Sequence, residues 1–302
     1  MFAHQYLQRN KKEPLISGKP HPELEIIVVV PCLTEPEILE TLRSLKRCEQ
    51  TSSKAEVIVV LNHAENAGQQ VKAFNFSSLR EIDGWIVRNQ TDWLRFYATG
   101  PFELKKKWAG AGLARKMGMD EAVRRFSQID KPEGLIVSLD ADTLVRKNYF
   151  IEIERHFARN PRHVGATIAF YHQTRWLSPK HLEGIQLYEK YLTYYKEAMR
   201  FTGYPHALFT VGSAFAVTAR DYVKRGGMNR RQAGEDFYFL QNLAHLGTIG
   251  EIKATAVYPS ARLSDRVPFG TGPILRKWMK GQEDLTQTYH FRAFIDLKQF
   301  FD

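Results

Sequence analysis

Apolar and polar positions alternate along the first third of the chain in the pattern of a parallel sheet covered by helices. Two apolar, β-branched runs, at residues 26–30 and 56–61, are separated by a stretch with helical spacing at residues 36–47. A strand, a helix and a second strand in this order indicate a βαβ unit. We expect two further strands, at residues 85–87 and 135–139.

The second half of the chain has a less regular pattern. A long helix at residues 108–126 precedes the fourth strand, and beyond it residues 164–170 and 211–217 are strand-like, whereas residues 179–201 form a long, aromatic-rich helix. The predicted fold class is therefore α/β, with a mostly parallel sheet, helices on both faces, and a mixed subregion. Residues 1–24 contain three prolines and are expected to be an irregular leader.

The charge balance indicates an anionic partner. The 302 residues include 43 Lys and Arg against 33 Asp and Glu, which gives a formal net charge of +10. Nucleotides, phospholipids and nucleic acid all meet this condition. A basic nucleic-acid-binding protein without catalysis is thus one hypothesis, but the chain lacks an RNP-like aromatic strand, a zinc knuckle and a basic heptad helix.

Cysteine content and hydropathy indicate a cytoplasmic protein. Cys32 and Cys48 are too few for a disulfide framework or a cysteine-based zinc site, which suits a reducing compartment. The apolar runs are too short for a membrane span, and the first residues lack the apolar centre of a signal peptide. We therefore predict a cytoplasmic location.

Two carboxylates directly follow the predicted strand at residues 135–139. Asp140 and Asp142 would lie at the carboxyl end of a parallel strand, where open sheets bind their ligands. Carboxylate oxygens at such a position suit Mg²⁺ or Mn²⁺ that holds a pyrophosphate. An isolated pair of this kind can equally cap the helix expected near Asn148. The metal assignment therefore depends on the other motifs of the chain.

Three further motifs accompany this pair in a fixed order. Residues 31–35 read Pro-Cys-Leu-Thr-Glu, residues 110–115 read Gly-Ala-Gly-Leu-Ala-Arg, and residues 234–237 read Gly-Glu-Asp-Phe. With the aspartate pair, this set resembles the family 2 inverting nucleotide-sugar glycosyltransferases of GT-A fold. The resemblance extends over residues 24–247.

The resemblance implies a division of the chain into three parts. The irregular leader at residues 1–24 would precede a GT-A domain at residues 25–272, whose sheet binds the nucleotide and whose mixed subregion lies on the acceptor side. Residues 273–302 would form a helical extension rich in aromatic and basic residues. That extension is expected either to pack as a C-terminal helix or to contact an anionic membrane peripherally, at its inner face.

The resemblance places the donor site at the tips of the first two strands. Pro31, Leu33 and Glu35 would border the nucleoside, and Asn62 would lie near the base. The family usually has an aromatic or small polar residue where Leu33 stands and an aspartate where Asn62 stands. Because an amide both donates and accepts hydrogen bonds, Asn62 leaves the identity of the base open. A UDP-linked sugar is the first expectation.

Four basic residues are candidates for contacts to the donor. By resemblance, Lys107 and Arg115 would approach the base or the diphosphate. Arg262 and Arg266 precede a glycine-rich loop, and guanidinium groups bind diphosphate in a bidentate manner. A solvated basic surface is the alternative interpretation for Lys107 and for the two loop arginines.

The acidic residues acquire roles from the same resemblance. Asp236 matches the general base, with Glu235 beside it, although acidic residues are also favoured at any helix N-terminus. Asp142 would be the principal ligand of Mn²⁺ or Mg²⁺, and Asp140 would bind the metal or the ribose. The motif order is what favours the catalytic interpretation.

The expected activity is therefore metal-dependent, inverting transfer of a sugar from a nucleotide-diphosphate sugar to a hydroxyl of a saccharide or lipid-linked acceptor. Polysaccharide biosynthesis is the usual setting of the family, and no nucleic-acid partner is expected. A nucleotidyltransferase of similar fold is an alternative, but the chain lacks a glycine-rich, lysine-containing loop directly after the first strand. A family member that binds nucleotide without turnover is a further alternative.

Overall fold

The computed structural model describes residues 1–211, 214–229, 234–264 and 270–302. These residues form two compact units. The sheet unit comprises Met1–Phe170 and Thr210–Val257, and the helical unit comprises Tyr171–Phe209 and Tyr258–Asp302. The boundaries expected at residues 24 and 272 do not coincide with this division, because segments that are distant in sequence pack together within each unit.

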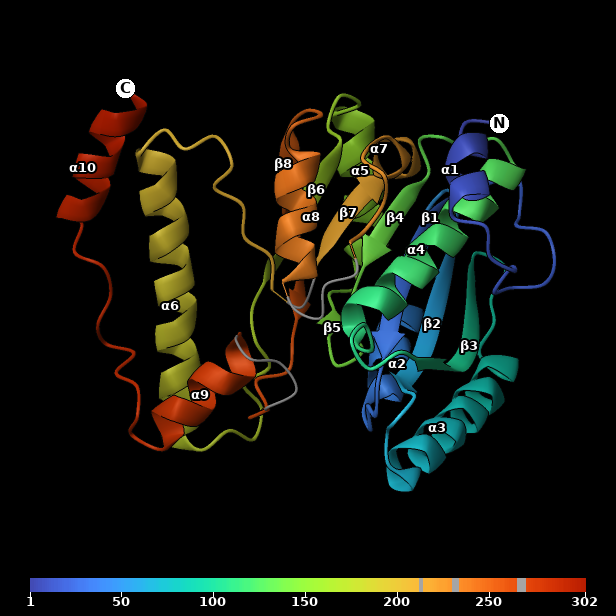
Figure 1. Cartoon of the computed structure of the whole chain (residues 1–302), viewed down its shortest axis with the longest axis horizontal. Helices are drawn as coiled ribbons and strands as arrows, with labels where there is room; N and C mark the ends of the chain where they lie inside the picture. The colour runs from blue at the N-terminus through green and yellow to red at the C-terminus, as the bar shows by residue number, and fades with distance from the viewer. Residues whose placement is uncertain (212–213, 230–233, 265–269) are drawn as a thin grey trace. The chain divides into compact units, whose positions relative to one another are not determined.

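Within the described residues, the sheet unit is built on one eight-stranded sheet (Figure 1). Its strands are β1 (Leu24–Cys32), β2 (Lys54–Ala64), β3 (Leu94–Leu104), β4 (Leu135–Ser138), β5 (Leu144–Val145), β6 (Gly165–Phe170), β7 (Phe215–Thr218) and β8 (Ile249–Tyr258). The strand order is β3-β2-β1-β4-β7-β6-β8-β5. The pairs β3–β2, β2–β1, β1–β4 and β6–β8 are parallel, whereas β7 runs antiparallel to both β4 and β6. The predicted α/β class with a mostly parallel sheet is confirmed.

Helices flank both faces of this sheet. They are α1 (His4–Arg9), α2 (Ile38–Lys46), α3 (Gln69–Val87), α4 (Ala111–Gln128), α5 (Tyr149–Arg159), α7 (Ala219–Lys224) and α8 (Glu235–Leu243). Helix α4 packs on β1 and β2, and α3 packs on β2 and β3. In Figure 1 α4 lies in front of β1 and β2.

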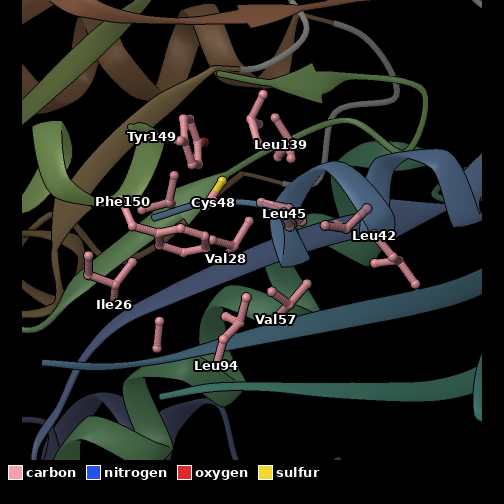
Figure 2. Packing of buried hydrophobic residues seen from close by; sticks show 14 of the residues in the cluster. Ile26, Val28, Leu42, Leu45, Cys48, Val57, Leu94, Leu139, Tyr149 and Phe150 are labelled. Carbon is pink, nitrogen blue, oxygen red and sulfur yellow. The ribbon is translucent and has the colours of Figure 1, made fainter. Parts of the chain in front are cut away.

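The side chains of successive residues in β1 point to opposite faces of the sheet, as the two-residue period of a strand requires. Ile26 and Val28 belong to a core shared with α2, α3 and α5, part of which Figure 2 shows. On the other face, α4 lies close to the sheet at Gly118: a Cβ atom there would stand 2.4 Å from Val29 Cγ1 and 3.1 Å from Val60 Cγ2. The absence of a side chain at this position allows the close approach.

The prediction of a strand at residues 85–87 is wrong. These residues are the last turn of α3, in which Ile82 and Trp85 are buried. The Trp85 ring packs edge-on against Phe96, with 5.0 Å between ring centroids. The third strand is β3, which the hydrophobic pattern did not indicate because it lies at the sheet edge and contains Gly100 and Pro101.

The leader is not wholly irregular, because α1 lies within it. Tyr6 of α1 is buried, and its hydroxyl donates to Asp120 Oδ1 at 2.6 Å. Lys116 Nζ donates to the Tyr6 oxygen at 3.0 Å, and the Tyr222 hydroxyl donates to Asp120 Oδ1 at 2.9 Å. This buried network attaches the leader to α4, and proline content alone does not reveal such pairing.

The helical unit is formed around α6 (Pro179–Phe201), with α9 (Thr271–Met279) and α10 (Arg292–Phe301) packed on it. Trp278 of α9 lies against Gly184, where a Cβ atom would stand 2.4 Å from Trp278 Cδ1. Trp278 Nε1 also donates to the Lys180 carbonyl at 2.9 Å. The residues expected to form a separate extension therefore pack on the long helix. Across the part of the chain that is described, no helix has both the length and the apolarity that a membrane crossing needs.

Candidate functional site

The parallel strands β1, β2 and β4 end along one edge of the sheet. Asp140 and Asp142 follow β4 at this edge. The Thr143 N–H donates to the Asp140 carbonyl at 3.1 Å, which closes a tight turn. The Asp140 side chain is 32% exposed, and Asp142 is also partly exposed. Both carboxylates therefore lie where a ligand at the strand ends can reach them.

A buried arginine, Arg115 of α4, connects the acidic residues of the site. Its side chain is 1% exposed. Nε donates to Ser138 Oγ at 2.8 Å, Nη2 donates to Asp140 Oδ1 at 2.5 Å, and Nη1 donates to Glu235 Oε1. One cation thus joins the end of β4, the turn that follows it and the start of α8. The sequence placed Arg115 near the base or diphosphate, whereas in the structure its guanidinium lies against protein carboxylates.

The charges of this cluster shift the pKa values of its members. Burial alone would lower the pKa of Arg115, but Glu235, Asp140 and Asp236 outweigh it and raise the pKa. Burial raises the pKa of Glu235, an effect that Arg115 opposes and Asp236 reinforces. The arginine charge is therefore needed to hold these carboxylates together at low dielectric.

Glu235 and Asp236 begin α8 and have different surroundings. Gly234, which precedes them, has φ 67°, a left-handed conformation that glycine adopts without strain. Glu235 is buried against Arg115, whereas Asp236 is partly exposed and its Oδ1 accepts the Phe237 N–H at 2.8 Å. Of the two predicted catalytic carboxylates, Asp236 is thus the one that solvent reaches more easily.

The residues expected around the nucleoside lie at the tips of β1 and β2. Pro31 is buried, Leu33 is partly exposed, and Glu35 is buried with its Oε1 accepting the Glu37 N–H at 3.3 Å. Asn62 is completely buried. The structure thus brings these residues to the same edge of the sheet but leaves the Asn62 amide no exposed surface.

The remaining predicted basic contacts are Lys107, Arg262 and Arg266. Lys107 is exposed, with its Nζ 4.2 Å from the centroid of the Trp108 ring. Arg262 belongs to the helical unit, so its location relative to the carboxylates is not defined. Arg266 lies outside the described residues. Lys107 therefore remains the one described basic candidate of the sheet unit that is exposed to solvent.

Asp140 and Asp142 suit a divalent-cation site in which the protein supplies only part of the coordination shell. Within the ranges that the structure describes, no group of three or more His, Cys, Asp or Glu side chains could enclose a metal ion. Asp140 and Asp142 provide hard oxygen ligands from a single turn. Mg²⁺ and Mn²⁺ are commonly held by one or two carboxylates, with substrate phosphates and water completing the shell. The pair fits that mode, and it does not fit a closed all-protein site.

Sequence reasoning missed Asn75, which contacts the same edge of the sheet. It lies in α3, is completely buried, and accepts the Thr34 N–H at 2.9 Å. The signal was weak because the pattern predicted no helix at residues 69–87 and because a lone asparagine is common in loops. A buried amide that binds the turn after β1 is visible only in three dimensions.

A family model matches the part of the chain that carries the acidic residues of the site. The family model described as "Glycosyl transferase family group 2" matches residues 135–297, a range that contains Asp140, Asp142, Glu235 and Asp236. Searches of curated proteins gave no match.

Solved structures show the fold. S. aureus TarS 1-349 in complex with UDP-GlcNAc matches with a TM-score of 0.50 and 14% identity, over 92% of this chain and 66% of that one. The mannosyltransferase PcManGT from Pyrobaculum calidifontis, in complex with GDP-Man and Mn²⁺, matches with a TM-score of 0.46 and 12% identity, over 86% of this chain and 64% of that one. This chain thus spans just under two thirds of either structure. At 14% identity, the likeness to TarS shows a GT-A-like fold.

Proposed function

Since the chain belongs to glycosyl transferase family group 2, we propose that it transfers a sugar from a nucleotide-diphosphate sugar to a hydroxyl of a saccharide or lipid-linked acceptor, with inversion at the anomeric carbon. The observation that carries this proposal is the cluster of carboxylates around Arg115 at the ends of parallel strands. Ligands of open α/β sheets bind at that edge. The family match favours neither a nucleotidyltransferase nor a nucleic-acid-binding protein.

Asp142 and Asp140 would hold a divalent cation, Mn²⁺ or Mg²⁺. A bound cation supplies positive charge that stabilises the departing diphosphate. Asp140 already shares Oδ1 with Arg115 at 2.5 Å. We therefore assign the principal ligand role to Asp142, with Asp140 binding the metal or the ribose.

Asp236 would act as the general base. It accepts the proton of the acceptor hydroxyl while that oxygen forms its bond to the anomeric carbon. The bond from that carbon to the diphosphate breaks, and its electron pair leaves with the diphosphate oxygen. Glu235 is less suited to this role because its carboxylate is buried and bound to Arg115. We assign to Glu235 the orientation of Arg115.

The nucleoside would lie against the tips of β1 and β2, bordered by Pro31, Leu33 and Glu35. Lys107, Arg262 and Arg266 are proposed contacts to the diphosphate. A UDP-linked sugar is the first donor to test, since TarS was solved in complex with UDP-GlcNAc. The protein would work in the cytoplasm, with peripheral contact to an anionic membrane through its C-terminal helix.

Calorimetric titration tests the donor site directly. UDP, GDP, CDP and TDP are titrated into the protein with Mn²⁺ and, separately, with EDTA. We expect one nucleoside diphosphate to bind in Mn²⁺ and to bind far more weakly in EDTA. Equal affinity in both buffers would contradict the metal-dependent site, and no binding of any nucleotide would contradict the proposed function itself.

A further inference from the structure

Asn75 has every polar atom of its side chain paired, although it lies completely buried within α3. Oδ1 accepts the Thr34 N–H at 2.9 Å. Nδ2 donates to the Asn62 carbonyl at 3.0 Å and faces His63 Nδ1 at 3.3 Å. A primary amide has two N–H donors and a carbonyl acceptor. The carbonyl and one N–H are used, and the second N–H donates to His63 in the tautomer whose Nδ1 carries no proton. Burying this group is favourable only because these partners are present.

Two of the three partners of Asn75 are backbone groups at the two strand tips of the proposed donor site, and the third is the His63 ring. Thr34 follows β1, and Asn62 lies near the end of β2. The helix α3 thereby holds the turn after one strand to the end of the next. Asn75 acts on the shape of the main chain there, since its amide binds the Thr34 N–H and the Asn62 carbonyl.

A second buried amide extends the same connection. Asn62 Nδ2 donates to the Cys32 carbonyl at 3.3 Å, and Asn62 Oδ1 accepts the Gly110 N–H at 3.3 Å. Gly110 immediately precedes α4, the helix that carries Arg115. Asn62 and Asn75 together thus join β1, β2, α3 and the start of α4. We call these two residues the amide clamp.

The turn after β1 needs such support. Thr34 has φ 49°, a left-handed conformation that β-branched residues rarely adopt. Strain of this kind persists where the surrounding structure over-determines the backbone. The hydrogen bond from the Thr34 N–H to Asn75 is one such constraint, and it fixes the direction in which the chain leaves Leu33.

We propose that Asn75 is a positioning residue of the donor site: its amide holds the turn at Thr34 and the end of β2 in the arrangement that receives the nucleoside. This inference rests on the proposed function. It assigns the role to a buried side chain, and it explains why Asn62, whose amide binds the Cys32 carbonyl and the Gly110 N–H, is not aimed at a base.

The test compares Asn75→Ala with the parent enzyme in nucleotide titrations and in donor kinetics. We expect nucleotide affinity to fall and donor KM to rise by about tenfold, the effect of losing positioning hydrogen bonds. The kcat at saturating donor should change less than about twofold, since Asp236 and the metal ligands are untouched. Ser78→Ala, another buried polar position of α3, is the matched control and should leave both constants unchanged.

Two further variants separate positioning from stability alone. Thr34→Gly removes the cost of the left-handed turn, so in the Asn75→Ala background it should restore part of the lost affinity. Asn75→Asp keeps the size of the side chain and the oxygen that faces Thr34 but loses both N–H donors, and it should also raise donor KM. If Asn75→Asp and Asn75→Ala bind nucleotide within twofold of the parent, the inference is overturned. If the parent itself binds no nucleotide, the proposed function fails instead.

Discussion

The candidate site lies along one edge of the sheet, and different kinds of interaction hold its two ends, the tips of β1 and β2 at one and the region of β4 and α8 at the other. At the tips of β1 and β2, the neutral amide clamp of Asn62 and Asn75 binds backbone groups. At β4 and α8, the charge of Arg115 binds the carboxylates of Asp140 and Glu235. Neutral hydrogen bonds fix main-chain shape over a wide pH range, whereas a buried ion cluster depends on every charge it contains. In the proposed function, the fixed main-chain shape would serve recognition of a nucleoside, and the charged cluster would serve chemistry at a diphosphate.

The largest effect is expected from Asp142→Asn at the charged end. The change keeps the shape of the side chain but removes a charged metal ligand, and loss of several kcal/mol of metal stabilisation lowers transfer by about 10³-fold. Nucleotide affinity in Mn²⁺ should fall to the value seen in EDTA. Calorimetry and an initial-rate assay measure both quantities. Parent-like affinity with the Mn²⁺ dependence retained would show that Asp142 is not the ligand.

Asp236→Asn should affect the rate and spare binding. Loss of a positioned general base costs about 10² to 10⁴ in rate. Donor and metal affinity should stay near the parent values, in contrast to Asp142→Asn. Single-turnover kinetics with the authentic acceptor, alongside nucleotide titration, measure the two separately. Nearly full transfer by Asp236→Asn would place the base elsewhere.

Arg115→Met should destabilise the charged end. Removing one partner from a buried ion cluster typically costs about 3 to 5 kcal/mol. Arg125→Met is the matched control, because Arg125 lies on the same helix and forms a buried ion pair with Glu56, with 2.5 Å between Nε and Oε2. Urea denaturation should show a comparable loss of stability in both variants. Only Arg115→Met should also weaken nucleotide binding, and equal binding losses would remove the special role of Arg115.

The pH dependence of stability should distinguish the two ends. Because burial raises the pKa of Glu235, the folded protein holds that proton more tightly than the unfolded chain does. This tighter proton binding stabilises the folded state. The stabilisation is fully present below the ordinary glutamate pKa and is lost as pH rises through the raised pKa of Glu235. The free energy of unfolding of the parent minus that of Glu235→Gln should therefore fall over this window. The same difference for Asn62→Ala should stay flat, because the Asn62 side chain binds two backbone groups, the Cys32 carbonyl and the Gly110 N–H. A slope for Asn62→Ala would contradict the distinction between the two ends.

The smallest effect is expected at the C-terminal helix α10 of the helical unit. Lys298 binds Asp302 at 2.7 Å, and Phe300 beside it is 81% exposed. Phe300→Ser should lower co-sedimentation with anionic vesicles at low salt by roughly fivefold, since burying part of a ring is worth about 1 kcal/mol. Val87→Ser, at a position 82% exposed in the sheet unit, is the control. Failure of the parent to bind these vesicles would remove the membrane hypothesis.

The sequence predicted the centre of the sheet better than its edge. Residues 26–30 and 135–138 are buried on both faces, so their strands consist of continuous apolar runs. The edge strand β3 is buried at Leu94 and Phe96 but mostly half-buried beyond them, and it lacks such a run. The apolar run at residues 85–87 belongs to the end of a helix, and a three-residue run has no period that separates helix from strand.

The site was predictable in its residue types but not in its pairings. The sequence predicted the location of Asp140 and Asp142 at the end of a strand, because the strand and the turn that follows it are formed by neighbouring residues. The partnership of Arg115 with Glu235 joins residues 120 positions apart, and the resemblance located both without indicating that they bind each other. The role of Asn75 likewise depends on α3 crossing the ends of two strands, which no local pattern specifies.

The contact of Gly118 with Val29 and Val60 limits which sequences this scaffold tolerates. A single methyl group at position 118 would overlap Val29 and displace α4 from the sheet. Arg115 lies one turn earlier on that helix, so a displacement there would reach every carboxylate that it binds. A position with no chemical function thus restricts substitution as strongly as an acidic residue of the site. Searches for related enzymes that score only polar motifs would overlook this requirement, and a redesign of the donor site should leave the glycine unchanged.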